Sequence, residues 1–267
     1  MNVAGVAATV AAPALLQGAL VALPRGNALA SLRRLRSPAW AAVLPGSIVA
    51  GTFAPLGGHS VALGMIGLAV LATPPLAVVA VLAVVRGPRA AVVSVALAAA
   101  ILAVFAGGLS RELSETCLTA LGALALGAAL ARLIPSRWAL AGFICMCAFD
   151  VAFLAAGVGQ PAADAVARAA AGVPGPMFDR AQLGPVSLDY PDLVLAAVLG
   201  GFLAGQRGQR CAATLVTVLA AICFVLVPSD VMCPATVPAA MTLIALRAIG
   251  LPRRPEIEAL VLEPASP

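Results

Sequence analysis

The stretch CMCAFDVAFLAAG, residues 145–157, places an aspartate inside an apolar run, and LDYPDLVLAAVLGGFLAG, residues 188–205, places another at the head of the next run. Such runs dominate the chain: hydrophobic residues make up 62% of it, charged residues 10%, and the mean hydropathy is +1.07. A soluble domain carries about 25% charged and about 45–50% apolar residues. The composition therefore indicates an integral membrane protein, in which Asp150 and Asp192 need an explanation.

Nine apolar segments follow one another along the chain, and a membrane span needs about 20 such residues. They cover residues 3–23, 39–57, 60–85, 88–108, 115–134, 137–157, 191–206, 211–229 and 233–250. We therefore expect an all-α, polytopic membrane protein with nine transmembrane helices. The third segment contains Pro74 and Pro75, and is either one long kinked helix or two short re-entrant pieces.

The basic residues predict the orientation of these spans. All sixteen are arginine, and with nine spans and an extracytoplasmic N-terminus, thirteen of them lie on the cytoplasmic side. Only Arg111, Arg168 and Arg180 lie outside, as expected when positive residues stay in the cytoplasm. We predict a multi-pass protein of the plasma membrane with a cytoplasmic C-terminus. Because the arginines serve as topology signals, the net charge of +5 does not indicate nucleic-acid binding. The use of arginine without lysine suggests a bacterial source.

The chain is expected to form one integral membrane domain over residues 1–267. Residues 1–134 supply the first five helices, residues 137–250 supply the last four, and residues 251–267 form a short cytoplasmic tail. The first segment carries its arginines after it, which is the opposite of the charge order of a cleavable signal peptide.

A long extracytoplasmic connection, residues 158–190, joins the sixth and seventh segments. Residues 161–173 begin with proline, contain good helix formers and close with glycine, which predicts a short helix lying at the membrane surface. The rest of the connection is rich in turn residues. Long loops of this kind are often functional.

The two aspartates are predicted to lie at a similar depth, in the outer half of the membrane. An aspartate near the centre of a span costs about 2.5–3.5 kcal/mol to insert, and such residues usually mark function. The sixth and seventh segments run in opposite directions, and helices joined in this way can pack side by side. Two carboxyls at one depth suggest a dyad that shares a proton. One member can then take a proton from water while the other protonates a scissile carbonyl.

Each aspartate also has a structural interpretation. Asp150 can hydrogen-bond a neighbouring helix, and Asp192 can cap the seventh segment, since YPDL at residues 190–193 looks like a helix start. Asp189 is a rival to Asp192 as the second carboxyl, but it would lie one turn earlier and closer to water. We favour Asp192 because it directly precedes the apolar run.

These residues resemble motifs of the presenilins and signal peptide peptidases, the GxGD-type intramembrane aspartyl proteases. AFDVAFLAAG, residues 148–157, resembles the tyrosine–aspartate motif of their sixth helix, with Phe149 in place of the tyrosine. DYPD, residues 189–192, stands where the family has GxGD on the seventh helix. CPATVPA, residues 233–239, resembles the PAL motif that opens the ninth. The resemblance covers residues 137–250, and the predicted orientation is similar to that of the signal-peptide-peptidase branch.

The resemblance implies a protease in which Asp150 and Asp192 are catalytic and which cleaves transmembrane helical peptides or proteins within the lipid bilayer. It implies no cofactor. It also implies a substrate-binding or scaffold role for Phe149, Tyr190, Pro191, Pro234, Ala235 and Thr236. Both glycines of GxGD are replaced, by Asp189 and Pro191. Glycine allows close backbone approach and proline fixes φ, so the pocket differs from that of the family or the site is inactive. Pro234 has an alternative role as the first-turn proline of a helix.

Other functions fit parts of the same sequence. The altered GxGD motif favours a catalytically inactive scaffold that binds transmembrane helices. Membrane aspartates also serve as proton relays in proton-coupled transporters, although the chain has no duplicated half-sequence. A prepilin-peptidase-like enzyme is a more distant alternative, because no second motif of that type follows. Metal binding is not expected, because the six cysteines form no CxxC pair and His59 is the single histidine.

Overall fold

The computed structural model describes most of the chain, and within the described part the fold is all-α apart from one short hairpin. The described residues are 3–26, 28–85, 88–104, 108–172, 176–178, 180–183, 186–206, 208–226 and 235–250. The α-helices are α1 (Val3–Ala22), α2 (Val43–Phe53), α3 (His59–Val79), α4 (Pro88–Ala103), α5 (Gly108–Leu133), α6 (Ser136–Ala155), α7 (Gly159–Ala170), α8 (Tyr190–Leu203), α9 (Gly208–Leu226) and α10 (Val237–Ala248). Shorter helical turns are η1 (Ala30–Leu35), η2 (Pro38–Ala42), η3 (Pro55–Gly57) and η4 (Ala80–Val84).

The predicted apolar segments are helices wherever the structure describes them. Among the described residues, five helical stretches are long and apolar enough to cross a membrane: Pro38–Gly57, His59–Val84, Ser110–Leu133, Ser136–Ala155 and Gly208–Leu226. Four shorter apolar helices in the described part lie at Val10–Ala22, Ala90–Ile101, Tyr190–Leu203 and Val237–Ala248. These lengths indicate a multi-pass membrane protein. The count of nine spans stays a prediction.

The third segment forms one helix rather than two re-entrant pieces. α3 continues through Pro74 and Pro75 and passes directly into η4, which is a turn of π-helix. Proline removes a backbone donor and crowds the preceding turn, and a wider turn of helix is one way to accommodate such a disturbance. The segment therefore stays continuous from His59 to Val84.

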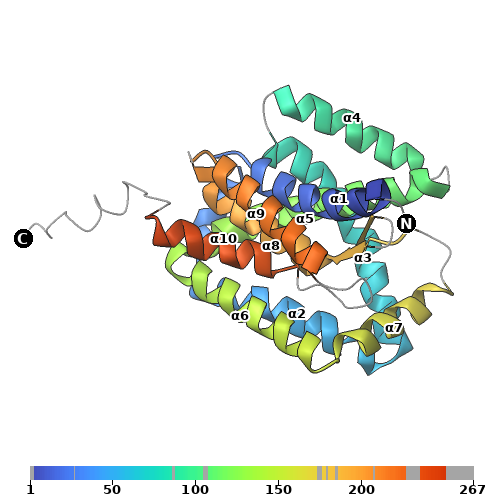
Figure 1. Cartoon of the computed structure of the whole chain (residues 1–267). Helices are drawn as coiled ribbons and strands as arrows, with labels where there is room; N and C mark the ends of the chain where they lie inside the picture. The colour runs from blue at the N-terminus through green and yellow to red at the C-terminus, as the bar shows by residue number, and fades with distance from the viewer. Residues whose placement is uncertain are drawn as a thin grey trace, which may run out of the picture.

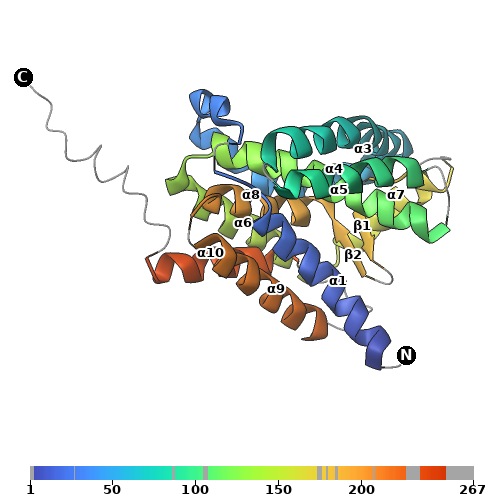
Figure 2. The ribbon, with the colours of Figure 1, turned by 90° about the horizontal axis from the view of Figure 1, so that it is seen from above.

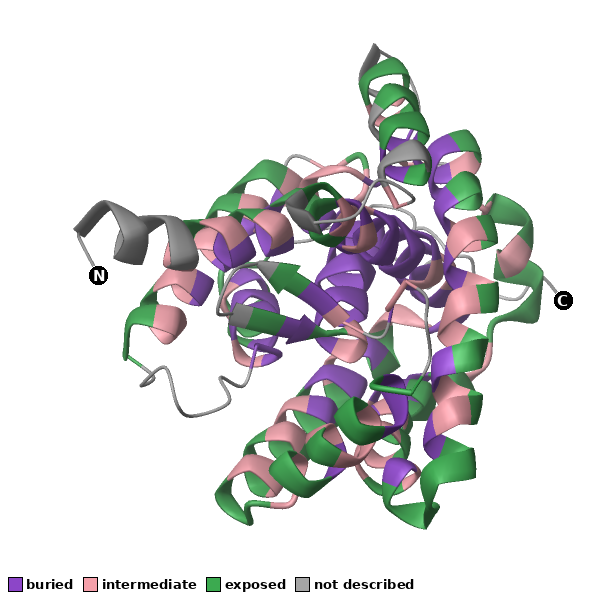
Figure 3. Ribbon diagram, turned by 90° about the vertical axis from the view of Figure 1, so that its right-hand side faces the viewer, coloured by how far each residue is buried: buried purple, intermediate pink, exposed green. Residues whose placement is uncertain are grey.

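The centre of the molecule is α8, where every residue from Asp192 to Leu203 is buried. Figure 1 shows α8 enclosed among its neighbours, and Figure 3 shows buried positions in the middle and exposed positions on the outer helices. α8 packs chiefly on α5 and α1. Two adjacent glycines allow this on both sides: a Cβ added to Gly200 would lie 2.7 Å from the Leu20 carbonyl oxygen, and one added to Gly201 would lie 2.6 Å from the Cβ of Ala131. Small residues at such interfaces let helix backbones approach closely in membranes.

The remaining helices form layers around α8. α1 packs against α9, and α3 and α4 pack against α5, as Figure 2 shows from above. α6 packs chiefly on α2 and also contacts α10. α10 in turn contacts α9 and α8, so it lies between the helices that carry the two aspartates.

The connection between α6 and α8 contains the predicted short helix and a hairpin that the sequence pattern does not predict. α7 occupies Gly159–Ala170 and packs its small buried residues against α3. The following part is expected to consist of turns, but it forms the antiparallel hairpin β1 (Arg180–Leu183) and β2 (Val186–Asp189). Ala181 and Leu188 face the core, while Gln182 and Ser187 are exposed. This alternation is the pattern of a half-buried strand, but at four residues per strand it is too short to distinguish from a loop by sequence alone.

The arginines whose side chains the structure describes separate into two sets at opposite ends of the bundle. At one end, Arg132 donates hydrogen bonds to the carbonyls of Gly26 and Ala28, and Arg247 donates to the carbonyl of Ser136. We call this the arginine-rich end; it also holds Arg25, Arg33, Arg34, Arg36, Arg137 and Arg210. Arg111, Arg168 and Arg180, the three arginines predicted to lie outside, belong to α5, α7 and β1 at the other end.

Candidate active site

Three segments converge around the two aspartates. Asp150 lies on α6, Asp192 lies in the first turn of α8, and Thr236 directly precedes α10. The hydroxyl of Thr236 donates a hydrogen bond of 2.6 Å to the Oδ2 atom of Asp150. Asp192 lies on α8, which contacts α10, and α10 also contacts α6. The structure thus brings Asp150 together with one residue of the PAL-like segment, and α10 links them to the helix that carries Asp192.

Asp192 has a structural role as well as this proximity. Asp189 is the N-cap residue of α8, and the two aspartates form a capping box in which each side chain accepts a backbone N–H of the other residue. The bond from the Asp189 N–H to Asp192 Oδ2 measures 3.3 Å. The capping interpretation of Asp192 is therefore partly right, but Asp189 is the cap itself. Asp189 is exposed, whereas Asp192 is only 9% exposed.

Pro191 lies where a proline costs the helix little. It occupies the first turn of α8, between the N-cap and Asp192. A backbone N–H in the first turn has no partner within the helix, and the φ of proline suits a helix start. The replacement of the second GxGD glycine by Pro191 therefore leaves the regular geometry of α8 intact.

Gln17 is a polar contributor to this region that none of the sequence motifs marks. Its side chain is completely buried within α1, and its amide donates a 3.0 Å hydrogen bond to the carbonyl of Ala235. Ala235 is buried next to Thr236, so α1 holds the residue that precedes the Asp150 partner. The signal in the sequence is a single glutamine in an apolar run, since a polar side chain in a span usually faces the protein interior.

The side chains of two other predicted site residues contact groups other than the aspartates. Phe149 is 42% exposed on α6, and its ring contacts that of Phe153 at a centroid distance of 5.7 Å. The hydroxyl of Tyr190 lies against α5, 3.1 Å from where a Cβ on Gly122 would be, at a place that Thr73 of α3 also contacts. Pro234 lies outside the described residues.

The expected packing of the two aspartate helices is wrong in one respect. The chain direction predicts that α6 lies beside α8, but α6 packs on α2 and α10, and α8 packs on α5 and α1. The reason lies in the surface of α8, which its small residues adapt to close contact with α1 and α5. α10 contacts both helices instead, and Thr236, which precedes it, hydrogen-bonds Asp150.

The aspartates lie at similar distances along their helices from the arginine-rich end. At 1.5 Å per residue, Asp150 is about 21 Å along α6 from its start, Asp192 is about 17 Å from the end of α8, and Thr236 is about 18 Å from the end of α10. All three measures begin at the arginine-rich end. α8 itself is about 21 Å long, which is shorter than a hydrocarbon core of about 30 Å. Non-helical backbone at membrane depth is tolerated only where protein buries it or where it lines a water-filled cavity.

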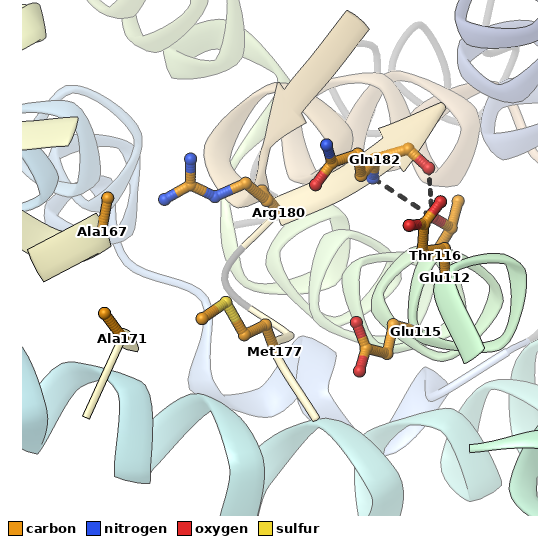
Figure 4. Close-up of a pocket in the computed structure, with 8 residues that line it drawn as sticks. All are labelled: Glu112, Glu115, Thr116, Ala167, Ala171, Met177, Arg180 and Gln182. Carbon is orange, nitrogen blue, oxygen red and sulfur yellow. Dashed lines mark hydrogen bonds between the residues drawn. The ribbon is translucent and has the colours of Figure 1, made fainter. Parts of the chain in front are cut away.

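A cavity of about 240 Å³ lies at the same end of the molecule as the hairpin, between α5, α7 and β1. Figure 4 shows Arg180 and Gln182 of β1 beside Glu112, Glu115 and Thr116 of α5. Thr116 fixes β1 to α5 through two hydrogen bonds with the backbone of Gln182, of 2.8 and 3.1 Å. Arg111 and Glu115 form an ion pair, with 2.8 Å between Arg111 Nε and Glu115 Oε1. Neither Asp150 nor Asp192 lines this cavity.

The described residues contain no group of three or more histidine, cysteine or carboxylate side chains that could hold a metal ion. The predicted site residues supply two carboxyls, with a hydroxyl donor beside Asp150. Comparison of the chain with family models, curated proteins and solved structures finds no match.

Proposed function

We propose that the chain is an intramembrane aspartyl protease of the signal-peptide-peptidase type, with Asp150 and Asp192 as its catalytic carboxyls. The observation that carries the proposal is the hydrogen bond from Thr236 to Asp150, at the start of a helix that packs on both α6 and α8. These residues come from three helices that are far apart in the chain. They are also the positions at which the motifs resemble those of the family.

The proposal includes a nine-span topology with an extracytoplasmic N-terminus. Its support is the separation of the described arginines into two ends, with Arg111, Arg168 and Arg180 together at the end that holds the hairpin. Under the positive-inside rule the arginine-rich end faces the cytoplasm. Water then reaches the aspartates from the extracytoplasmic side, past the exposed Asp189.

The two carboxyls divide the hydrolysis between them. Asp150 is the more exposed, so it takes a proton from the attacking water while the water oxygen bonds to the scissile carbonyl carbon. Asp192 gives its proton to the carbonyl oxygen. Collapse of the tetrahedral intermediate breaks the C–N bond. The leaving nitrogen takes the proton from Asp150, and one hydroxyl of the intermediate returns a proton to Asp192. Thr236 holds one oxygen of Asp150, which leaves the other free to face the water.

The experiment is the cleavage of co-expressed single-span substrates by variants of the aspartates. Asp150→Asn and Asp192→Asn should each abolish cleavage, because each removes an ionisable group from the pair. Asp189→Asn is the matched control and should retain most activity, because asparagine caps a helix about as well as aspartate does. Thermal unfolding of all three variants checks that they fold. Normal cleavage by either of the first two variants would contradict the proposal.

A second candidate is a membrane scaffold that binds transmembrane helices without cleaving them. The observation that favours it is that both aspartates already have structural partners, Thr236 for Asp150 and the capping box for Asp192. The same substrate panel separates the two. Capture of the substrate helices by the unmutated protein without any cleavage would favour the scaffold.

A further inference from the structure

A second cavity, of about 340 Å³, lies at the arginine-rich end, where the chain leaves α1 and enters α9. Its lining includes Arg25, Gly26, Gly205, Gln209 and Arg210. It is on the opposite end of the bundle from the hairpin. The residues that line it take no part in the proposed hydrolysis, so its role is independent of whether the chain cleaves peptides.

The wall of this cavity is tied together by one side chain. The amide of Gln209 donates to the carbonyls of Val21 and Pro24, at 3.0 and 2.8 Å, and its Oε1 accepts the N–H of Gly205 at 3.2 Å. Gln209 thus joins the end of α1 to the turn between α8 and α9. The turn also comes close to the first connection: a Cβ on Gly205, whose φ is +80°, would lie 3.3 Å from the Cα of Gly26. The cavity is therefore framed by fixed backbone.

Two arginines give this frame a positive charge. Arg25 is half-buried and Arg210 is exposed, and neither forms an ion pair or hydrogen bond through its side chain within the described residues. The described carboxylates belong to α5, α6, α7, β2 and the first turn of α8, away from this end. Arg210 also lies in the first turn of α9, where unpaired backbone N–H groups favour an anion. The positive charge here has no counter-charge from the described protein.

The position of the cavity indicates which kind of anion it binds. Arg25 follows an apolar helix and Arg210 opens another, so both lie at the level of the lipid headgroups. Basic pockets between transmembrane helices on the cytoplasmic side, where the proposed topology puts this end, bind anionic headgroups. The planar guanidinium binds phosphate through two parallel hydrogen bonds. The geometry points to a binding site for the phosphodiester of an anionic phospholipid, held by Arg25 and Arg210 on the frame that Gln209 makes.

The test uses the purified full-length chain in neutral detergent micelles, to which phosphatidylglycerol is added. We expect the thermal unfolding midpoint to rise with the phosphatidylglycerol fraction and to stay constant with phosphatidylcholine, whose headgroup has no net charge. Arg25→Gln/Arg210→Gln should weaken the apparent affinity at least tenfold. Arg33→Gln/Arg34→Gln is the matched control, because these exposed arginines lie at the same end outside the cavity. It should stay within about twofold of the unmutated protein, since arginines outside the framed cavity attract lipid only diffusely.

Two further measurements keep the test decisive. Arg25→Lys/Arg210→Lys keeps the charge and hence the topology signal, and we expect a loss of several-fold, since lysine cannot form the paired hydrogen bonds. Inorganic phosphate at the same concentration should have no effect. An equal rise with inorganic phosphate would show a free-anion site and overturn the lipid assignment. An equal loss of affinity for phosphatidylglycerol in the Arg33/Arg34 control would overturn it too. If the glutamine variant does not fold, the lysine variant decides, and an unchanged affinity in that variant would overturn the assignment.

Discussion

Replacement of Gly200 by alanine tests whether α8 is held as closely as the structure indicates. The added Cβ would lie 2.7 Å from the Leu20 carbonyl oxygen and 2.8 Å from the Cα of Val21. Ordinary contacts of a Cβ begin near 3.4 Å, and both neighbours are backbone atoms of α1. α1 and α8 would therefore have to separate by several tenths of an ångström, and overpacking of this kind costs about 1–3 kcal/mol.

A gain in helix propensity opposes this cost. Alanine favours a helix interior over glycine by about 1 kcal/mol, so the net loss in the free energy of unfolding should be up to about 2 kcal/mol. Gly67→Ala in α3 is the control, because nothing lies within 4 Å of its added Cβ. It has the propensity gain alone, and its stability should be unchanged or slightly higher.

The assay is reversible unfolding of both variants in detergent, followed by the helical circular dichroism signal. Gly200→Ala should unfold at lower denaturant than the unmutated protein, and Gly67→Ala should not. If Gly200→Ala is as stable as Gly67→Ala, α8 does not pack on α1 as described. The position given for Asp192 would then be wrong as well, because α8 carries it.

Three other predictions concern the site, the connections and the topology. Thr236→Val should lower the rate of substrate cleavage by about tenfold, or about 1.4 kcal/mol, because Asp150 loses its hydroxyl donor. Thr236→Ser keeps a hydroxyl and should keep most of the rate. Equal rates for the valine and serine variants would contradict the role of Thr236 in positioning Asp150. Arg132→Gln should reduce the free energy of unfolding by about 1–3 kcal/mol, because the carbonyls of Gly26 and Ala28 lose their donor. Arg137 is exposed, and Arg137→Gln should change the free energy of unfolding by less than about 0.5 kcal/mol. Equal effects of the two substitutions would refute this. Reporter fusions should place the N-terminus outside and the C-terminus inside the cell, and finding both on one side would rule out nine spans.

The helices are predictable because each is encoded by its own apolar run, and run length is a local property of the sequence. The convergence of Asp150 with the segment at Thr236 is suggested only by the motif resemblance, since no local pattern relates the start of α10 to α6. The packing of α6 on α2 rather than α8 depends on which helix surfaces are small enough for close contact, as at Gly200. The hairpin escapes prediction because strands of four residues give almost no periodic signal. The hydrogen bond from Gln17 to Ala235 depends on the tertiary fold, so the local sequence around either residue does not predict it.

The hydrogen bond from Gln17 to Ala235 joins residues separated by 218 positions in the chain. Ribosomes add about 5–20 residues per second, so α1 is in place for about 10 to 40 s before its partner exists. During that time the amide of Gln17 has no protein acceptor from the segment that opens α10, and the face of α1 that packs on α9 is uncovered. A glutamine amide in hydrocarbon is costly unless it donates a hydrogen bond, so it pairs with whichever acceptor is within reach. Biogenesis of this protein therefore includes an interval in which its first helix needs shelter, by the insertion machinery or by the helices already made, until the last one arrives.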